Sequence, residues 1–212
     1  MAKYPIYLDL EGRRVVVIGA GNVAARKVQS LTATGARIVV VAEHATGVFQ
    51  DACEGANIEL VISSYSRDYL AGAVLAIAAT NDTALNNRIY KDCQELDVLC
   101  NVVDVPDLCD FYVPALVERG SLQIAVGTDG KCPAYSGHLR RKLEEMFTDR
   151  HGLFLDELDK IRKHIIATVD DGDRRKAILG QLVKDESFEY FKKNGPDPWQ
   201  KRAMEIINSG GV

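Results

Sequence analysis

The sequence predicts an α/β protein that opens with a Rossmann-type parallel sheet and closes with an all-helical region. Three observations support this prediction. A glycine-rich turn at residues 19–24 stands between an apolar strand and a helix-forming segment. Apolar strands alternate with helical patterns through the first half of the chain, which is typical of a parallel sheet with crossover helices. After about residue 151 only helical spacing remains.

The glycine-rich turn has the pattern of a dinucleotide fingerprint. Residues 14–24 read RVVVIGAGNVA, a β-branched run that leads into G-x-G-x-x-A. Gly19 permits a sharp turn, Gly21 leaves room for a pyrophosphate against the backbone, and Ala24 lets the helix pack closely on the sheet. The free N–H groups at the start of the helix then face the phosphates. The alternative is a glycine turn in some other βαβ protein.

A second strand and the acidic residue after it complete the βαβ unit. Residues 37–42 read RIVVVA and are followed by Glu43. An acidic residue about 20 positions after the glycines is where a ribose-binding carboxylate belongs. Its charge would repel a 2′-phosphate, so Glu43 favours NAD over NADP. His44 follows directly and is placed to touch the adenosine end.

The remaining elements of the first half follow in regular order. We expect strands over residues 14–18, 37–42, 58–62, 74–79 and 97–103, and helices near 22–34, 45–55 and 82–95. The fourth strand stops at Thr80 and Asn81, and the fifth ends in Asn101 to Asp104. Because ligands bind outside the carboxyl ends of parallel strands, these residues should line the same crevice as the glycine turn. Thr80 or Asn81 could equally cap the helix that follows, and the two roles can coexist.

The pattern changes after about residue 110. Residues 111–115 and 122–126 look like a hairpin whose turn spans 118–121. A turn-rich loop at 127–133 and a helix containing residues 140–145 come next. Further on, helical spacing is carried by Leu155, Leu158, Ile161, Ile165 and Ile166. A break at 170–173, more helix to about 193, an interruption at 195–198 and a last short helix complete the tail.

Composition narrows the class of protein. With 47% hydrophobic and 26% charged residues among 212, the chain has the composition of a soluble globular protein. A net charge of −4 argues against general nucleic-acid binding. No apolar stretch is long enough to span a bilayer, and the N-terminus lacks the apolar segment of a signal peptide. Five scattered cysteines without a C-x-x-C pair are typical of a reducing cytoplasm.

Asp104 is the acidic residue most suited to catalysis. At the end of a strand, its carboxylate would look into the cofactor crevice, where it could accept a proton while a hydride leaves for a nicotinamide. It could also steer a metal entering a tetrapyrrole. The alternative is a turn-forming aspartate before Val105 and Pro106. No histidine pair has metal-ligand spacing, so we expect no protein-bound metal, and the motifs of hydrolases and short-chain dehydrogenases are missing.

Several segments together resemble one family, the precorrin-2 dehydrogenases that form the N-terminal module of siroheme synthases. The resemblance is strong to about residue 147 and loose in the tail, and it lies in Tyr4–Leu8, Val17–Lys27, Ala78–Asp82, Cys100–Asp104 and Phe111–Pro114. It implies an NAD-binding Rossmann domain over 1–112, a dimerisation segment over 113–150 and a helical C-terminal domain over 151–212, assembled as a homodimer.

The resemblance also implies an activity and a set of site residues. The family oxidises precorrin-2 to sirohydrochlorin with NAD+, and some members insert iron as ferrochelatases, so Fe2+ or Co2+ would be a substrate. The catalytic aspartate of the family corresponds to Asp104, and the cofactor turn to Asn22 and Val23. Two departures stand out: Glu43 replaces a common proline, and the loop at 127–133 is less rich in serine and glycine.

The substrate would be a macrocycle rich in carboxylates. Lys131, Arg140 and Arg141 could pair with those carboxylates, or they could belong to a solvent-facing helix surface. Two alternatives to this function stay open. One is a non-catalytic nucleotide-sensing Rossmann module, and the other is an NAD-dependent dehydrogenase of another small substrate.

Overall fold

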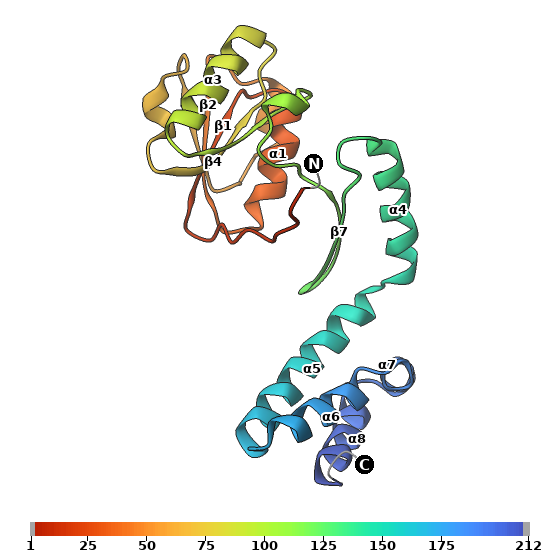
Figure 1. Cartoon of the computed structure of the whole chain (residues 1–212). Coiled ribbons are helices and arrows are strands. Elements are labelled where there is room, and N and C mark those ends of the chain that lie inside the picture. The colour runs from red at the N-terminus through yellow and green to blue at the C-terminus, as the bar shows by residue number, and fades with distance from the viewer. Residues whose placement is uncertain (1–2, 210–212) are drawn as a thin grey trace. The chain divides into compact units, whose positions relative to one another are not determined.

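A computed structural model describes residues 3–209. The chain forms two compact units, one ending at Val113 and the other beginning at Pro114. Each unit has its own core, and each is described separately (Figure 1).

The first unit is a five-stranded parallel sheet in the order β3-β2-β1-β4-β5. Every strand and helix expected in this half is present, with ends within three residues of those expected. The sheet consists of β1 Arg14–Ile18, β2 Arg37–Ala42, β3 Ile58–Ile62, β4 Ala73–Ala78 and β5 Leu99–Val102. The connecting helices are α1 Asn22–Thr32, α2 Gly47–Ala52 and α3 Thr83–Glu95, with short 3-10 helices η1 Arg67–Leu70 and η2 Pro106–Leu108. The Rossmann-type fold class is therefore confirmed.

Both faces of the sheet are buried, which explains the continuous apolar strands. Successive residues of β1 point to opposite faces. Val15 and Val17 belong to the core that contains residues of α1 and α2. Val16 and Ile18 belong to the core that contains residues of η1 and α3. Because the chain order reverses between β1 and β4, the carboxyl ends of these two strands form the switch point where ligands bind in such sheets.

The second unit begins with an antiparallel pair, β6 Ala115–Arg119 and β7 Leu122–Val126. The expected hairpin is present and its second strand over 122–126 is confirmed, but the first strand expected over 111–115 is wrong, and the turn is shorter than the expected 118–121. Pro114 has no N–H to donate to a ladder, so pairing starts only after it. The turn is the shorter Gly120-Ser121, where Gly120 has φ +58°, a left-handed conformation that glycine adopts without strain.

Helices form the rest of the second unit. They are α4 Pro133–Met146, α5 Asp149–Thr168, α6 Gly172–Leu182, α7 Asp185–Asn194 and α8 Pro196–Asn208. Ile161 and Ile165 are buried in the helical core as their spacing predicts, whereas Ile166 is exposed. The break between α6 and α7 was not expected from the sequence. The interruption expected over 195–198 is present but is confined to Gly195, because proline fits the first helical position and Pro196 already begins α8.

The end of α4 and the start of α5 pack against the hairpin. The Arg119 guanidinium donates to two carbonyls at the end of α4, those of Phe147 (2.7 Å) and Glu144 (3.2 Å). A Cβ on Gly152 would lie 2.3 Å from the Arg119 carbonyl oxygen, so only glycine allows this close approach. No helix in the described part of the chain is long and apolar enough to cross a membrane.

Candidate active site

Gly19 occupies the turn after β1 because no other residue fits there. Its φ is +109°, and a Cβ would lie 2.4 Å from the Ala79 carbonyl oxygen. Its N–H donates to the carbonyl of Val41 at 2.8 Å. The turn after β1 is therefore held between the ends of β2 and β4.

Gly21 leaves the space in front of α1 open. It is the N-cap of α1 with extended backbone, and a Cβ there would meet nothing within 4 Å. The N–H groups of Asn22 and Val23 lie in the first turn, where a helix offers them no internal partner. No acidic residue stands in this turn to neutralise the positive helix end. Ala24 is fully buried, so α1 packs closely on the sheet. These features fit a pyrophosphate group.

Glu43 is exposed at the end of β2, and its carboxylate is oriented by a hydrogen bond. Its Oε1 accepts from the Ser64 hydroxyl at 2.9 Å. The backbone N–H and the hydroxyl of Thr46 both donate to the carbonyl of Ala20, at 3.1 and 3.2 Å. The loop that carries Glu43 and His44 is thus tied to the glycine turn. Ser64 lies far from Glu43 in sequence, and no motif pointed to it.

Thr80 follows β4 and is fixed by a buried side chain. The Thr80 hydroxyl donates to Asn86 Oδ1 at 2.7 Å, and Asn86 Nδ2 donates to the Thr80 carbonyl at 3.1 Å. Asn86 is 6% exposed. The N-cap of α3 is Asp82, which accepts from the Leu85 N–H at 3.0 Å, so the capping alternative for Thr80 or Asn81 is wrong. Asn81 is exposed beside them.

Asn101 is buried within β5 and holds the returning chain. It is 7% exposed, and its Nδ2 donates to the Phe111 carbonyl at 2.9 Å and to Cys109 Sγ at 3.4 Å. The Asp110 carboxylate accepts from the Cys100 N–H at 2.8 Å along the same strand. The amide of Asn101 therefore stabilises the segment that returns past β5 at Cys109 and Phe111.

Asp104 lies just past the end of β5 and is exposed. The N–H of Val103 donates to the carbonyl of Ala78 at 3.0 Å, which extends the pairing with β4 by one residue. Asp104 itself has φ +62°, in the left-handed region. Burial and the charge of Arg26 lower the pKa of Lys27 on α1, and the negative charge of Asp104 opposes that decrease. An ammonium group of α1 thus lies within electrostatic range of this carboxylate.

Two family models match the chain. One, described as NAD(P)-binding, covers residues 6–115, and the other, described as the central part of sirohaem biosynthesis proteins, covers residues 119–146. The chain belongs to the family of siroheme synthase N-terminal modules. Membership gives this siroheme synthase-type module an NAD(P)-binding domain.

Curated relatives and a solved structure agree with this membership. A siroheme synthase of Photobacterium profundum is 32% identical over 96% of this chain and 43% of its own. A siroheme synthase of Psychrobacter arcticus is 36% identical over 72% of this chain and 28% of its own. The chain thus spans less than half the length of these relatives. The solved structure titled SirC, precorrin-2 dehydrogenase, shares the fold with a TM-score of 0.78 and 22% identity, covering 96% of this chain and all of that one.

The cations expected to bind substrate lie in the second unit of the module. Lys131 and Arg141 are exposed, while Arg140 forms an ion pair with Glu144 one turn further along α4. Arg140 is therefore less available to a ligand than Arg141. Within residues 3–209, no group of three or more histidine, cysteine, aspartate or glutamate side chains is arranged to hold a metal ion.

The carboxyl edge of the sheet can support dinucleotide-dependent proton and hydride chemistry. The turn after β1 has the open backbone and positive helix end that a pyrophosphate needs. The loops after β2 and β4 carry fixed polar groups, and the turn after β5 carries an exposed carboxylate. All belong to the first unit.

Proposed function

We propose that this chain oxidises precorrin-2 to sirohydrochlorin, with NAD+ as the hydride acceptor and Asp104 as the catalytic base. The printed names of its relatives, siroheme synthase and precorrin-2 dehydrogenase, support this substrate. The observation that carries the proposal is the position of Asp104 at the carboxyl end of β5, on the same sheet edge as the glycine turn. A non-catalytic nucleotide sensor has no need of a carboxylate there.

The reaction removes a hydride and a proton from the substrate. NAD+, when bound, supplies the acceptor for the hydride. Gly19 and Gly21, with Asn22 and Val23, hold the pyrophosphate end, and Thr80 and Asn81 contribute to the cofactor crevice. Asn101, expected from the sequence to contact the cofactor, instead supports the crevice from within the fold. Asp104 takes the proton and, because it is exposed, releases it to water.

The preference for NAD+ over NADP+ follows from Glu43. Its carboxylate, oriented by Ser64, would accept hydrogen bonds from a ribose 2′-hydroxyl and repel a 2′-phosphate. His44, next to it, would contact the adenosine. Binding of NADP+ as tight as that of NAD+ would contradict this part of the proposal.

We also propose a homodimer. Among residues 3–209, β6 and β7 pair only with each other, so each leaves one edge without a partner strand. A two-stranded sheet is marginal on its own, and strands of a second copy would complete it. A cytoplasmic location fits the five free cysteines.

Precorrin-2 turnover tests the function directly. Under anaerobic conditions the chain should convert precorrin-2 and NAD+ to sirohydrochlorin and NADH, followed by the absorbance of both products. Nucleotide binding without turnover would instead identify a sensor. Adding Co2+ or Fe2+ to the sirohydrochlorin formed tests metal insertion in the same cuvette.

A second experiment tests the substrate cations. Charge reversal at Lys131 and Arg141 should raise the KM for precorrin-2 and leave the KM for NAD+ unchanged. Lys176→Glu is a matched control, because Lys176 is an exposed lysine of α6 outside the proposed site. An unchanged KM for precorrin-2 in the double variant would overturn the assignment of these cations.

A further inference from the structure

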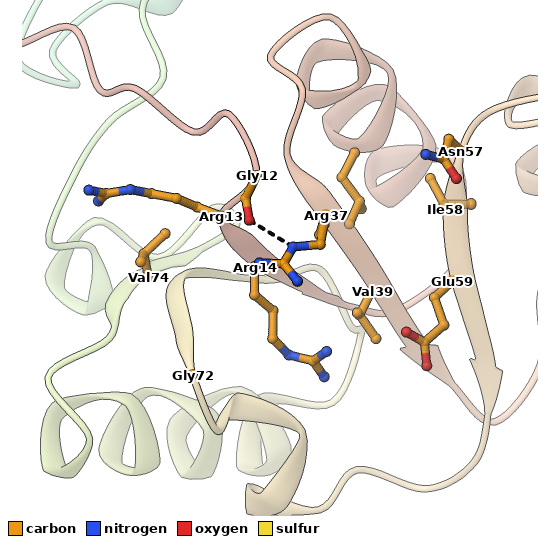
Figure 2. Close-up of a pocket in the computed structure, with 11 residues that line it drawn as sticks. Gly12, Arg13, Arg14, Arg37, Val39, Asn57, Ile58, Glu59, Gly72 and Val74 are labelled. Atoms are coloured by element: carbon orange, nitrogen blue, oxygen red, sulfur yellow. Dashed lines mark hydrogen bonds between the residues drawn. The ribbon is translucent and has the colours of Figure 1, made fainter.

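A hollow of about 630 Å3 opens at the amino ends of the strands, on the sheet edge opposite the glycine turn (Figure 2). Its lining includes three arginines, Arg13, Arg14 and Arg37, together with Gly12 and Glu59. Arg14 and Arg37 begin β1 and β2, whereas Gly19 and Glu43 follow the ends of these strands. At about 3.3 Å per residue, roughly 16 Å separates Arg14 from Gly19 along the chain.

Two of these arginines are neighbours across the sheet. Arg14 and Arg37 are register partners on β1 and β2, and adjacent strands run about 4.8 Å apart. Like charges opposite each other destabilise a sheet. The pair therefore gains from an anion that lies between the guanidinium groups.

Both guanidinium groups are anchored to backbone carbonyls. An Nη of Arg14 donates to the Tyr69 carbonyl at 3.2 Å, and Nε of Arg37 donates to the Gly12 carbonyl at 2.7 Å. Nε of Arg14 is shielded from solvent and has no hydrogen-bond partner within the described part of the chain. A buried donor without an acceptor is unfavourable and rare in native proteins. An anchored guanidinium group with an N–H still free, as at Arg14, is suited to an oxyanion.

The negative charge in the hollow does not neutralise the arginines. Glu59 is the acidic residue of its lining, against three arginines. Among residues 3–209, the ion pairs within 4.0 Å involve none of Arg13, Arg14 and Arg37. Figure 2 shows the Arg13 side chain pointing away from Arg14 and Arg37. Those two arginines and Glu59 leave one net positive charge, which favours an anion.

We propose that this hollow binds a small oxyanion, with a phosphoryl group as the chemical class that fits it best. The guanidinium fork presents parallel N–H groups to two oxygens of one phosphoryl group, and a second arginine can contact a third. Gly12, whose carbonyl accepts from Arg37, has no side chain to fill the hollow. Because the hollow and the glycine turn occupy opposite edges, occupation of one does not block the other.

Inorganic phosphate is the probe for this site. Titration calorimetry in a phosphate-free buffer, with NAD+ at saturation so that the glycine turn is filled, should show one phosphate per chain. Acetate at matched ionic strength should not bind. Arg14→Met should weaken phosphate binding at least tenfold, and Arg14→Lys, which keeps the charge but loses the fork, several-fold. Lys91→Met is the matched control. It removes one charge from an exposed residue of α3, and this variant should bind phosphate as the parent does.

Thermal unfolding separates this site from a structural role of Arg14. In phosphate-free buffer, Arg14→Met should unfold at the same or a higher temperature than the parent, because it removes a buried unpaired donor and the repulsion from Arg37. Phosphate should raise the unfolding temperature of the parent and not that of the variant. If Arg14→Met does not fold, Arg37→Met and Arg14→Lys give the same comparison. Phosphate affinity within twofold of the parent in these variants, or no binding to the parent at about 10 mM phosphate, would overturn the proposal.

Discussion

Replacing Asp104 by asparagine tests its catalytic role with little disturbance of the fold. Asp104 has φ +62°, and asparagine is one of the few residues that tolerate this region. The substitution keeps the shape of the side chain and removes the group that accepts a proton. We expect turnover to fall by about 10²–10⁴, the range that general base catalysis supplies. Affinity for the dinucleotide should not change, because the glycine turn after β1 is untouched.

The backbone conformation of Asp104 gives a second, independent readout. The left-handed region costs a residue with a Cβ roughly 1–2 kcal/mol. Asp104→Gly relieves that strain and loses about 0.5–1 kcal/mol through the greater freedom of the unfolded chain. We therefore expect a stability equal to that of the parent or up to about 1.5 kcal/mol higher, where each 1 kcal/mol raises the unfolding temperature by roughly 2–4 °C. Asp104→Ala keeps the strain without the entropy loss of glycine, so it should be less stable than Asp104→Gly by up to about 1.5 kcal/mol.

The assay combines three measurements on the same variants. NADH formation from precorrin-2 gives turnover, fluorescence titration gives dinucleotide affinity, and thermal unfolding gives stability. Asp104→Gly should be as inactive as Asp104→Asn and at least as stable as the parent. Turnover close to that of the parent in Asp104→Asn would refute the catalytic role. If turnover instead rises and falls with the unfolding temperature across Asp104→Asn, Asp104→Gly and Asp104→Ala, then Asp104 acts only by stabilising the fold.

Three further substitutions test the site and the packing. Gly21→Val should weaken dinucleotide binding at least tenfold by titration calorimetry. It should lower the unfolding temperature by only a few degrees, because a Cβ there meets no protein atom within 4 Å and valine is merely a poorer N-cap than glycine. Glu43→Ala should strengthen NADP+ binding relative to NAD+ several-fold by fluorescence titration, and an unchanged ratio would contradict the role of its charge. Gly152→Ala should lower the free energy of unfolding by about 1–3 kcal/mol, because its Cβ would lie 2.3 Å from the Arg119 carbonyl, whereas Gly180→Ala, with open space around it, should be neutral or stabilising.

The first unit could be predicted from sequence because its signals are local. The strands of a sheet buried on both faces are short β-branched runs, as in residues 14–18, and glycines mark the turns that follow. The first strand of the hairpin was misplaced by several residues because Phe111 looks like a strand residue in isolation, whereas the second strand was predicted at its observed residues. In the structure its carbonyl accepts from Asn101, a contact across ten positions that no local pattern contains. Pro114 was the available signal, since proline cannot donate to a ladder.

The site residues also divide into those that local sequence predicts and those that it does not. Gly19 and Gly21 were predictable because each performs its role through its own backbone. Ser64 and Asn86 were not, because they act by fixing Glu43 and Thr80 from other elements of the fold. Asn86 stands near the buried Ile89 on α3, and a polar residue on the buried side of a helix is a signal that a partner exists. Its partner Thr80 is only six positions away, whereas Ser64 reaches Glu43 through the pairing of β2 with β3, which only the tertiary structure reveals.

Positive φ at Asp104 does not by itself indicate catalysis. Asp97 and Asp129 also have positive φ, at 54° and 53°, and aspartate tolerates this conformation in turns. Asp97 lies between α3 and β5, where a helix ends and a left-handed residue is common. Asp104 differs because its left-handed turn follows the extended pairing of β5 with β4 and leaves an exposed carboxylate at the switch-point edge. A glycine would serve that turn with less strain, so the turn alone does not call for a carboxylate, and the position of Asp104 at the switch-point edge carries the case for a role in chemistry.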